Sequence, residues 1–137
     1  MSQKQVGGIG NLIGYLGNSI QEFPLGERRW NLEIAIVCYK ILLDVFPKDR
    51  SPEKWAATQN NLAIAYRKRI EGDTAQNIDQ GIAAYNLALT VYDRAAFPEL
   101  WGAVKTNLSA AYRERIRGER RDNIEKSIAM AREALMV

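Results

Sequence analysis

The sequence has no histidine, one cysteine and four prolines in 137 residues. Without histidine, the chain lacks the commonest general base and the commonest protein metal ligand. The single cysteine, Cys38, excludes a disulfide within the chain, and its apolar helical surroundings predict an inert buried thiol. Because proline breaks helix interiors, its scarcity permits long helices.

Long apolar runs are also missing. No run reaches the roughly 18 residues that a membrane-spanning helix needs. Residues 1–6 carry one lysine, and no basic segment leads into a clean apolar run, so no secretory signal is recognisable. Apolar residues make up 47% of the chain and charged residues 26%, which is ordinary for a folded soluble protein. These features predict a cytoplasmic protein.

One stretch of the sequence occurs twice, 46 residues apart. Residues 60–73 read NNLAIAYRKRIEGD, and residues 106–119 read TNLSAAYRERIRGE. Periods of this size are typical of stacked supersecondary units. We therefore predict one domain, residues 1–137, with repeats at 31–76 and 77–122, which share 17 identical positions, and a partial repeat at 123–137.

Apolar periodicity predicts an all-α chain with three helix pairs and no strand. Asn31, Asn77 and Asn123 are each followed by an apolar residue and an acid, which is typical of helix N-caps. Gly26, Gly72 and Gly118 are predicted to end helices with a positive φ. The predicted helices span residues 8–21, 31–46, 52–70, 77–95, 98–116 and 123–136.

The first predicted helix, residues 8–21, lies in a glycine-rich segment. Each glycine inside a helix costs about 1 kcal/mol relative to alanine, so this helix needs a neighbour to be stable. It is most simply a degenerate first copy of the repeated helix. Glycines also allow close backbone approach, so contact with a membrane or with a second helix is an open alternative.

The recurring aromatic residues have two interpretations. Stacking in the core is the simpler one, and a ligand platform is the alternative. Trp101 in particular is predicted to be a core residue. The pairs concerned are Trp55 and Trp101, Tyr66 and Tyr112, and Tyr39 and Tyr85.

The residues Asn61-Leu62-Ala63, Tyr66, Gly72-Asp73, Tyr85 and Ala88 resemble a tetratricopeptide repeat. The period of 46 exceeds the family's usual ~34, and is similar to the long-helix variety of kinesin light chain-like arrays and of bacterial, often cyanobacterial, multi-repeat proteins. The resemblance covers residues 31–137 well and residues 8–30 poorly. It implies a right-handed α-solenoid of about three helix pairs, with a groove that binds an extended peptide or a partner helix.

The resemblance also implies which residues line that groove. Arg67 and Arg113 suit carboxylates, although solvation or pairing with Glu71 and Glu114 explains them equally well. Asn61 and Asn107 either face the groove or cap local backbone. The family's clamp for a C-terminal carboxylate is incomplete here, because a third full repeat is missing. The groove positions are Asn60, Asn61, Ile64, Arg67, Lys68, Thr106, Asn107, Ala110, Arg113 and Glu114, with Ala57 and Ala103 beside them.

Arginines gather after each repeated helix and predict a basic edge. Such an edge attracts nucleic acid or an acidic protein, but no aromatic residues alternate with the arginines, so base stacking lacks support. The residues of this basic edge are Arg69, Arg115, Arg117, Arg120 and Arg121.

The pattern therefore favours a non-catalytic interaction scaffold that uses no cofactor and no metal. A nucleic-acid or anionic-partner binder and a structural or oligomerisation module are the alternatives. The last helix is as apolar as the internal ones, which predicts either that the chain is cut from a longer array or that its ends meet another subunit. We expect self-association, most simply a two-fold dimer through a terminal helix pair. The residues expected to mediate it are Ile128, Ala131 and Leu135.

Overall fold

The computed structural model describes residues 2–24 and 26–136, and these form six α-helices and no strand. The predicted all-helical class is therefore confirmed for this part of the chain. The helices are α1 (Gln3–Glu22), α2 (Arg28–Val45), α3 (Pro52–Lys68), α4 (Thr74–Ala88), α5 (Pro98–Glu114) and α6 (Arg120–Leu135).

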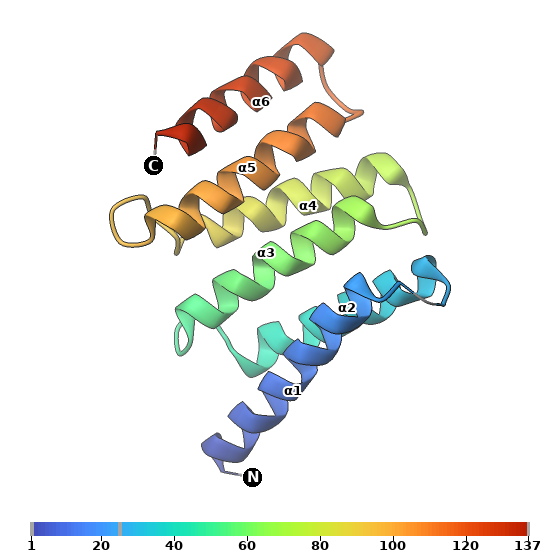
Figure 1. Cartoon of the computed structure of the whole chain (residues 1–137), viewed down its shortest axis with the longest axis vertical. Coiled ribbons are helices and arrows are strands. Elements are labelled where there is room, and N and C mark those ends of the chain that lie inside the picture. The colour runs from blue at the N-terminus through green and yellow to red at the C-terminus, as the bar shows by residue number, and fades with distance from the viewer. Residues whose placement is uncertain (1, 25, 137) are drawn as a thin grey trace.

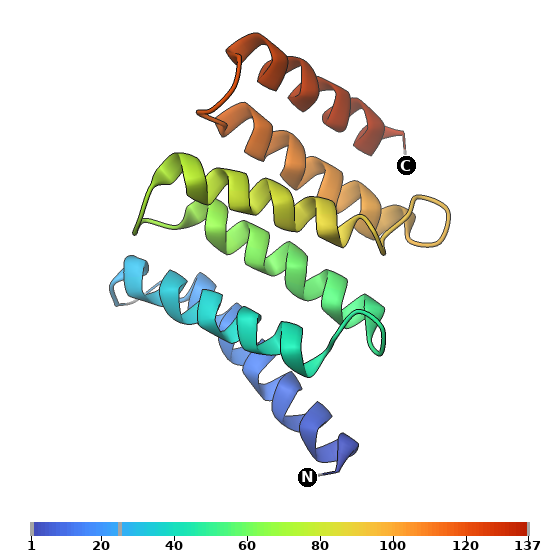
Figure 2. The ribbon, with the colours of Figure 1, turned by 180° about the vertical axis from the view of Figure 1, so that it is seen from behind.

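Each helix packs against its neighbours in chain order, and two layers result. Figure 1 shows α1, α3 and α5 on the near side, and Figure 2, from behind, shows α2 and α4 in front of them. Within the near layer, α3 contacts both α1 and α5. We call the side formed by α1, α3 and α5 the odd-helix face.

Three helices, α2, α4 and α6, each begin three residues earlier than predicted, because the asparagines are not N-caps. The N-caps of α2, α4 and α6 are Glu27, Asp73 and Glu119, and each asparagine lies four residues further on, inside the helix. The first helix also begins early, at Gln3, because Ser2 and Gln5 form a capping box there.

The prediction that the fourth helix continues to residue 95 is wrong, since α4 ends at Ala88. The Asp93 carboxylate accepts hydrogen bonds from the backbone N–H groups of Ala95 and Ala96. Such side-chain bonds compete with the helical pattern and build a turn instead. The glycine prediction is confirmed, because Gly26, Gly72 and Gly118 have φ of 89°, 79° and 82°.

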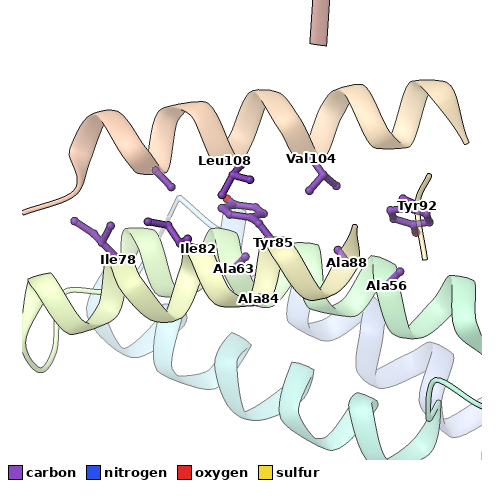
Figure 3. Close-up of a cluster of buried hydrophobic side chains, with 11 residues drawn as sticks. Ala56, Ala63, Ile78, Ile82, Ala84, Tyr85, Ala88, Tyr92, Val104 and Leu108 are labelled. Carbon is purple, nitrogen blue, oxygen red and sulfur yellow. The ribbon is translucent and has the colours of Figure 1, made fainter. Parts of the chain in front are cut away.

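Two clusters of buried side chains hold the layers together. Figure 3 shows the second, in which Ile82 and Tyr85 point from α4 toward Val104 and Leu108 of α5. The first cluster lies around Tyr39 and contains residues of α2 and α3. Tyr39 and Tyr85 are almost fully buried, as predicted, so they are core residues.

Trp101 is not a core residue, contrary to the prediction. It is half-buried in the first turn of α5 and belongs to neither cluster. The charged groups of Arg94 and Lys105 lie 5.7 and 5.4 Å from its ring centroid. The tryptophan therefore supports two cations at the edge of the fold.

The glycines of α1 bring it close to α2. A methyl group on Gly10 would lie 2.6 Å from the Phe46 ring, and one on Gly17 would lie 3.1 Å from the Tyr39 ring. The neighbour on which this helix depends is therefore α2. Cys38 is buried there, and burial raises the pKa of its thiol, which fits the predicted inert thiol.

Candidate interaction surface

Two arginines of the basic edge form ion pairs between successive helix pairs. The Arg69 guanidinium donates to both carboxylate oxygens of Glu33 on α2, at 2.6 and 2.9 Å. One repeat later, Arg115 Nε donates to Asp79 of α4 at 2.8 Å. The hydrogen bond from Arg69 holds the pKa of Glu33 below its usual value. The side chains of Arg69 and Arg115 are both about three-quarters buried, so each arginine lies between two helix pairs and joins them.

The other three arginines of the basic edge are exposed and also have partners. Arg117 lies 3.4 Å from Asp79 and 3.8 Å from Asp73, and Arg121 donates to Glu125 at 2.9 Å. Arg120 donates to the backbone carbonyl of Arg113, and no carboxylate among the described residues pairs with its charge. The positive charge of this edge is therefore largely balanced within the molecule.

The predicted groove residues between α3 and α5 contact one another. Arg67 lies 3.6 Å from Glu114 and donates to the Asn107 carbonyl at 3.4 Å. The Asn107 amide in turn donates to Asn60 Oδ1 at 3.4 Å. These polar contacts close the odd-helix face between α3 and α5.

The remaining predicted groove residues are more dispersed. Ile64 is half-buried and packs against the second core cluster, and Ala110 on α5 is also half-buried. The Thr106 hydroxyl donates to the Gly102 carbonyl of its own helix. Lys68 lies 3.6 Å from Glu22 of α1, and Arg113 is exposed.

A hollow of about 210 Å³ lies on the odd-helix face between α1 and α3. Gly10 and Gly14 lie against α2, where an added methyl group would meet Phe46 or Leu42, and Ala57 contributes a small exposed side chain to the lining. The Asn61 amide donates to Asn18 Oδ1 at 3.1 Å and links the two helices across it. The lining residues are Gly10, Asn11, Gly14, Tyr15, Asn18, Tyr39, Leu42, Phe46, Lys54, Ala57, Thr58 and Asn61. We call this space the α1–α3 hollow.

Of the predicted groove residues, the structure brings only Asn61 and the adjacent Ala57 to the α1–α3 hollow. Sequence reasoning missed Asn11, Tyr15 and Asn18, because it treated α1 as a degenerate copy. The exposed aromatic side chain of Tyr15, four residues from Asn11 and three from Asn18, was the available signal.

Two tyrosines at the same repeat position differ in their hydrogen bonds. The Tyr39 hydroxyl borders the α1–α3 hollow and lies 2.8 Å from Asn18 Oδ1 and 3.3 Å from Gln21 Oε1, and donates its proton to this pair. The Tyr85 hydroxyl is buried and has no hydrogen-bond partner among the described residues. Burial raises the pKa of Tyr85 to about 12, so it is neutral at physiological pH.

Replacing Tyr39 by phenylalanine is expected to lower the free energy of unfolding by about 1–2 kcal/mol, because Asn18 and Gln21 lose a donor. Tyr85→Phe is the matched control, and is expected to be neutral or stabilising since it removes an unpaired buried hydroxyl. Urea denaturation of both variants measures the difference. Equal losses for the two variants would contradict the hydrogen bonding described for Tyr39.

A second apolar surface lies on α2, on the opposite side of the molecule. Trp30, Ile34, Val37 and Ile41 are all exposed, and their spacing places them on one side of the helix. The same positions of α4 hold Gln76, Gln80, Ala83 and Leu87. This α2 stripe is therefore peculiar to the first helix pair and is not a consequence of the repeat.

Among the described residues, no group of three or more acidic or cysteine side chains is placed to hold a metal ion. In that same part of the chain, none of the helices is long and apolar enough to cross a membrane.

Comparison with known proteins found no matching family model, no similar curated protein and no similar solved structure. The tetratricopeptide resemblance therefore stays an expectation drawn from the residues.

Proposed function

We propose that the protein is a non-catalytic, cytoplasmic interaction scaffold. Its helix stack is a right-handed α-solenoid of the tetratricopeptide type, and its odd-helix face binds an extended peptide or a partner helix. The α1–α3 hollow is the centre of this binding surface. The observation that carries the proposal is a space floored by small residues and bordered by exposed amide groups.

The lining of the hollow suits a peptide. Asn11, Asn18 and Asn61 present amide groups that both donate and accept, as a peptide backbone does. Tyr15 adds an exposed ring, and aromatic side chains are enriched at protein interfaces. Lys54 brings a positive charge to the same wall, which favours an acidic group in the partner.

The contacts on the odd-helix face favour this location over the α3–α5 groove expected from the sequence. Arg67 and Glu114 form an ion pair there, so a ligand would have to replace a contact between charges, whereas across the hollow it would compete with the hydrogen bond between the neutral amides of Asn61 and Asn18. The space between α1 and α3 is open instead, with the small side chain of Ala57 in its lining. The basic edge remains a second candidate for anionic partners, supported only by Arg120 and Arg113, whose charges have no carboxylate partner in the described contacts.

Filling the hollow tests the proposal. Ala57 is exposed and lines it, so Ala57→Trp is expected to fill the space without disturbing the core. Peptides selected against the wild-type protein from a display library of random linear peptides are expected to bind this variant about tenfold or more weakly. Ala83→Trp places the same side chain on an exposed position of α4 and is expected to bind normally.

Ile34→Glu on the α2 stripe distinguishes the two surfaces. Selected peptides that lose binding to Ile34→Glu and keep it to Ala57→Trp would show that the stripe, not the hollow, binds peptide. Affinity that falls steeply with salt and follows Arg113 and Arg120 would favour the anionic-partner function instead.

A further inference from the structure

The last helix exposes side chains whose repeat equivalents are buried. Ile128 of α6 is 46% exposed, whereas Ile36 of α2 and Ile82 of α4, at the same repeat position, are 4% and 8% exposed. Ile82 points toward α5 in Figure 3, which shows why it is buried. The difference therefore reflects the neighbour, since the side chain is the same at all three positions.

The first helix shows the complementary pattern. Leu16 of α1 is 53% exposed, whereas Leu62 of α3 and Leu108 of α5 are 5% and 1% exposed. Those two leucines belong to the core clusters that join α3 to α2 and α5 to α4. Inside the stack, α2 packs on α3 and α4 packs on α5. The exposed α6 surface corresponds to the α2 and α4 side of these junctions, and the exposed α1 surface corresponds to the α3 and α5 side.

A further hollow of about 220 Å³ lies between α5 and α6, where Ala131 occupies the repeat position of Tyr39 and Tyr85. Thr106, Ser109 and Leu135 complete its lining together with Ala134. The tyrosine ring that fills this position in the other two repeats is missing here. The end of the stack therefore has room for an aromatic side chain from outside.

We propose that α1 of one copy packs on α6 of a second copy, as α3 packs on α2 and α5 packs on α4 within the chain. Leu12 and Leu16 of one copy then cover Ile124 and Ile128 of the other. The proposal goes beyond the peptide-binding function and does not depend on it, but both use the Tyr15 ring, so a bound peptide and a second copy compete for it.

The repeat also places Tyr15 in this junction. Its equivalents, Asn61 and Asn107, each donate a hydrogen bond to the preceding helix of the odd-helix face, at Asn18 and Asn60. The equivalent of Asn60 in the next repeat is Thr106, which lines the hollow left by Ala131. The exposed ring of Tyr15 therefore enters that hollow.

Because the α1 and α6 surfaces differ, the interface is heterologous, and successive copies add to one another in an open chain, or in a ring where the rotation between copies closes. It replaces the two-fold dimer that the sequence suggested. The junction between copies lacks the ion pair of the internal junctions, which joins Arg69 to Glu33 and Arg115 to Asp79. On α6 the acid is present as Glu125, but Phe23 of α1 occupies the position of the arginine. The junction between copies is accordingly weaker than the internal ones.

Mixing two blocked variants tests the arrangement. Leu16→Glu blocks the α1 surface and Ile128→Glu blocks the α6 surface, and both positions are exposed, so both variants are expected to keep the wild-type helical content. We expect the mass of the wild type to rise steadily with concentration, and each variant alone to stay at 15.5 kDa. Their equimolar mixture should form a species of twice that mass, because one intact α1 surface meets one intact α6 surface.

A two-fold dimer gives a different result. If α6 pairs with α6, Leu16→Glu still dimerises by itself, and mixing adds nothing. A wild type that stays monomeric at every concentration would overturn the proposal outright.

A strengthened junction provides a second measurement, which does not depend on blocking. Phe23→Arg restores the arginine opposite Glu125 and is expected to lower the dissociation constant several-fold, with Glu125→Ala reversing the gain. An unchanged dissociation constant for Phe23→Arg would exclude the register proposed for the two copies.

Discussion

Replacing Leu108 by alanine is expected to lower the free energy of unfolding by about 2–5 kcal/mol. Leu108 is almost fully buried between α4 and α5, in contact with the cluster that contains Ile82 and Tyr85 (Figure 3). Replacing its isobutyl group by a methyl group removes buried apolar area and leaves a cavity. The helices around this cavity can close it only in part, because each is held by its other neighbour. Chemical denaturation of the wild type and the variant gives the difference directly.

Leu16→Ala is the matched control, because Leu16 has the same side chain at the same repeat position and is exposed. At a dilution where the protein is monomeric, its effect is expected to stay within about 0.5 kcal/mol, as for other surface substitutions. A loss as large as that of Leu108→Ala would mean that α1 is covered within the monomer, which would contradict both the fold and the proposed junction between copies.

The helices themselves followed from the sequence. The apolar spacing predicted all six, and Pro52 and Pro98 lie in the first turn of α3 and α5, where proline is tolerated. The positive φ of Gly72 and Gly118 also followed from their place after each repeated helix. These features depend on neighbours within a few residues, so the local sequence determines them.

The binding surface could be predicted from the sequence only in part, because its residues contact partners that are distant in the sequence. Arg67 pairs with Glu114, and Arg69 with Glu33, and neither pair is visible in local spacing. The α1–α3 hollow is lined by Asn11, Tyr15 and Asn18 of α1, and the repeat has other residues at each of these positions. A transferred repeat pattern describes what two copies share, whereas this hollow arises where the first copy differs.

Asparagine 77 shows how one local pattern fits two structures. An asparagine ahead of an apolar residue and an acid suits an N-cap, and it also suits a side chain that fixes the preceding loop. In the structure, Asn77 Nδ2 donates to the Glu71 carbonyl at 2.8 Å, and Arg69 lies 3.4 Å from its Oδ1. Asn123 repeats both contacts, with the Arg117 carbonyl and with Arg115. The asparagine thus ties the positive-φ glycine loop to the helix that follows.

Asn77→Asp is therefore expected to lower the free energy of unfolding by about 2–4 kcal/mol. Aspartate keeps the shape of the side chain but cannot donate to the Glu71 carbonyl, and it places a negative charge at a buried position 2.8 Å from that oxygen. If Asn77 were the N-cap, the same change would be nearly neutral, since aspartate and asparagine are equivalent N-caps.

The reciprocal change at the observed cap completes the test. Asp73 accepts from the backbone N–H of Gln76 at 2.7 Å, so Asp73→Asn keeps the cap and is expected to change stability by no more than about 0.5 kcal/mol. Its contact with Arg117, at 3.8 Å and largely exposed, adds little. Thermal and urea denaturation of the two variants should rank Asn77→Asp well below Asp73→Asn. The opposite ranking would show that Asn77 is the N-cap. The positive φ of the glycine in each of the three equivalent loops would then need another explanation.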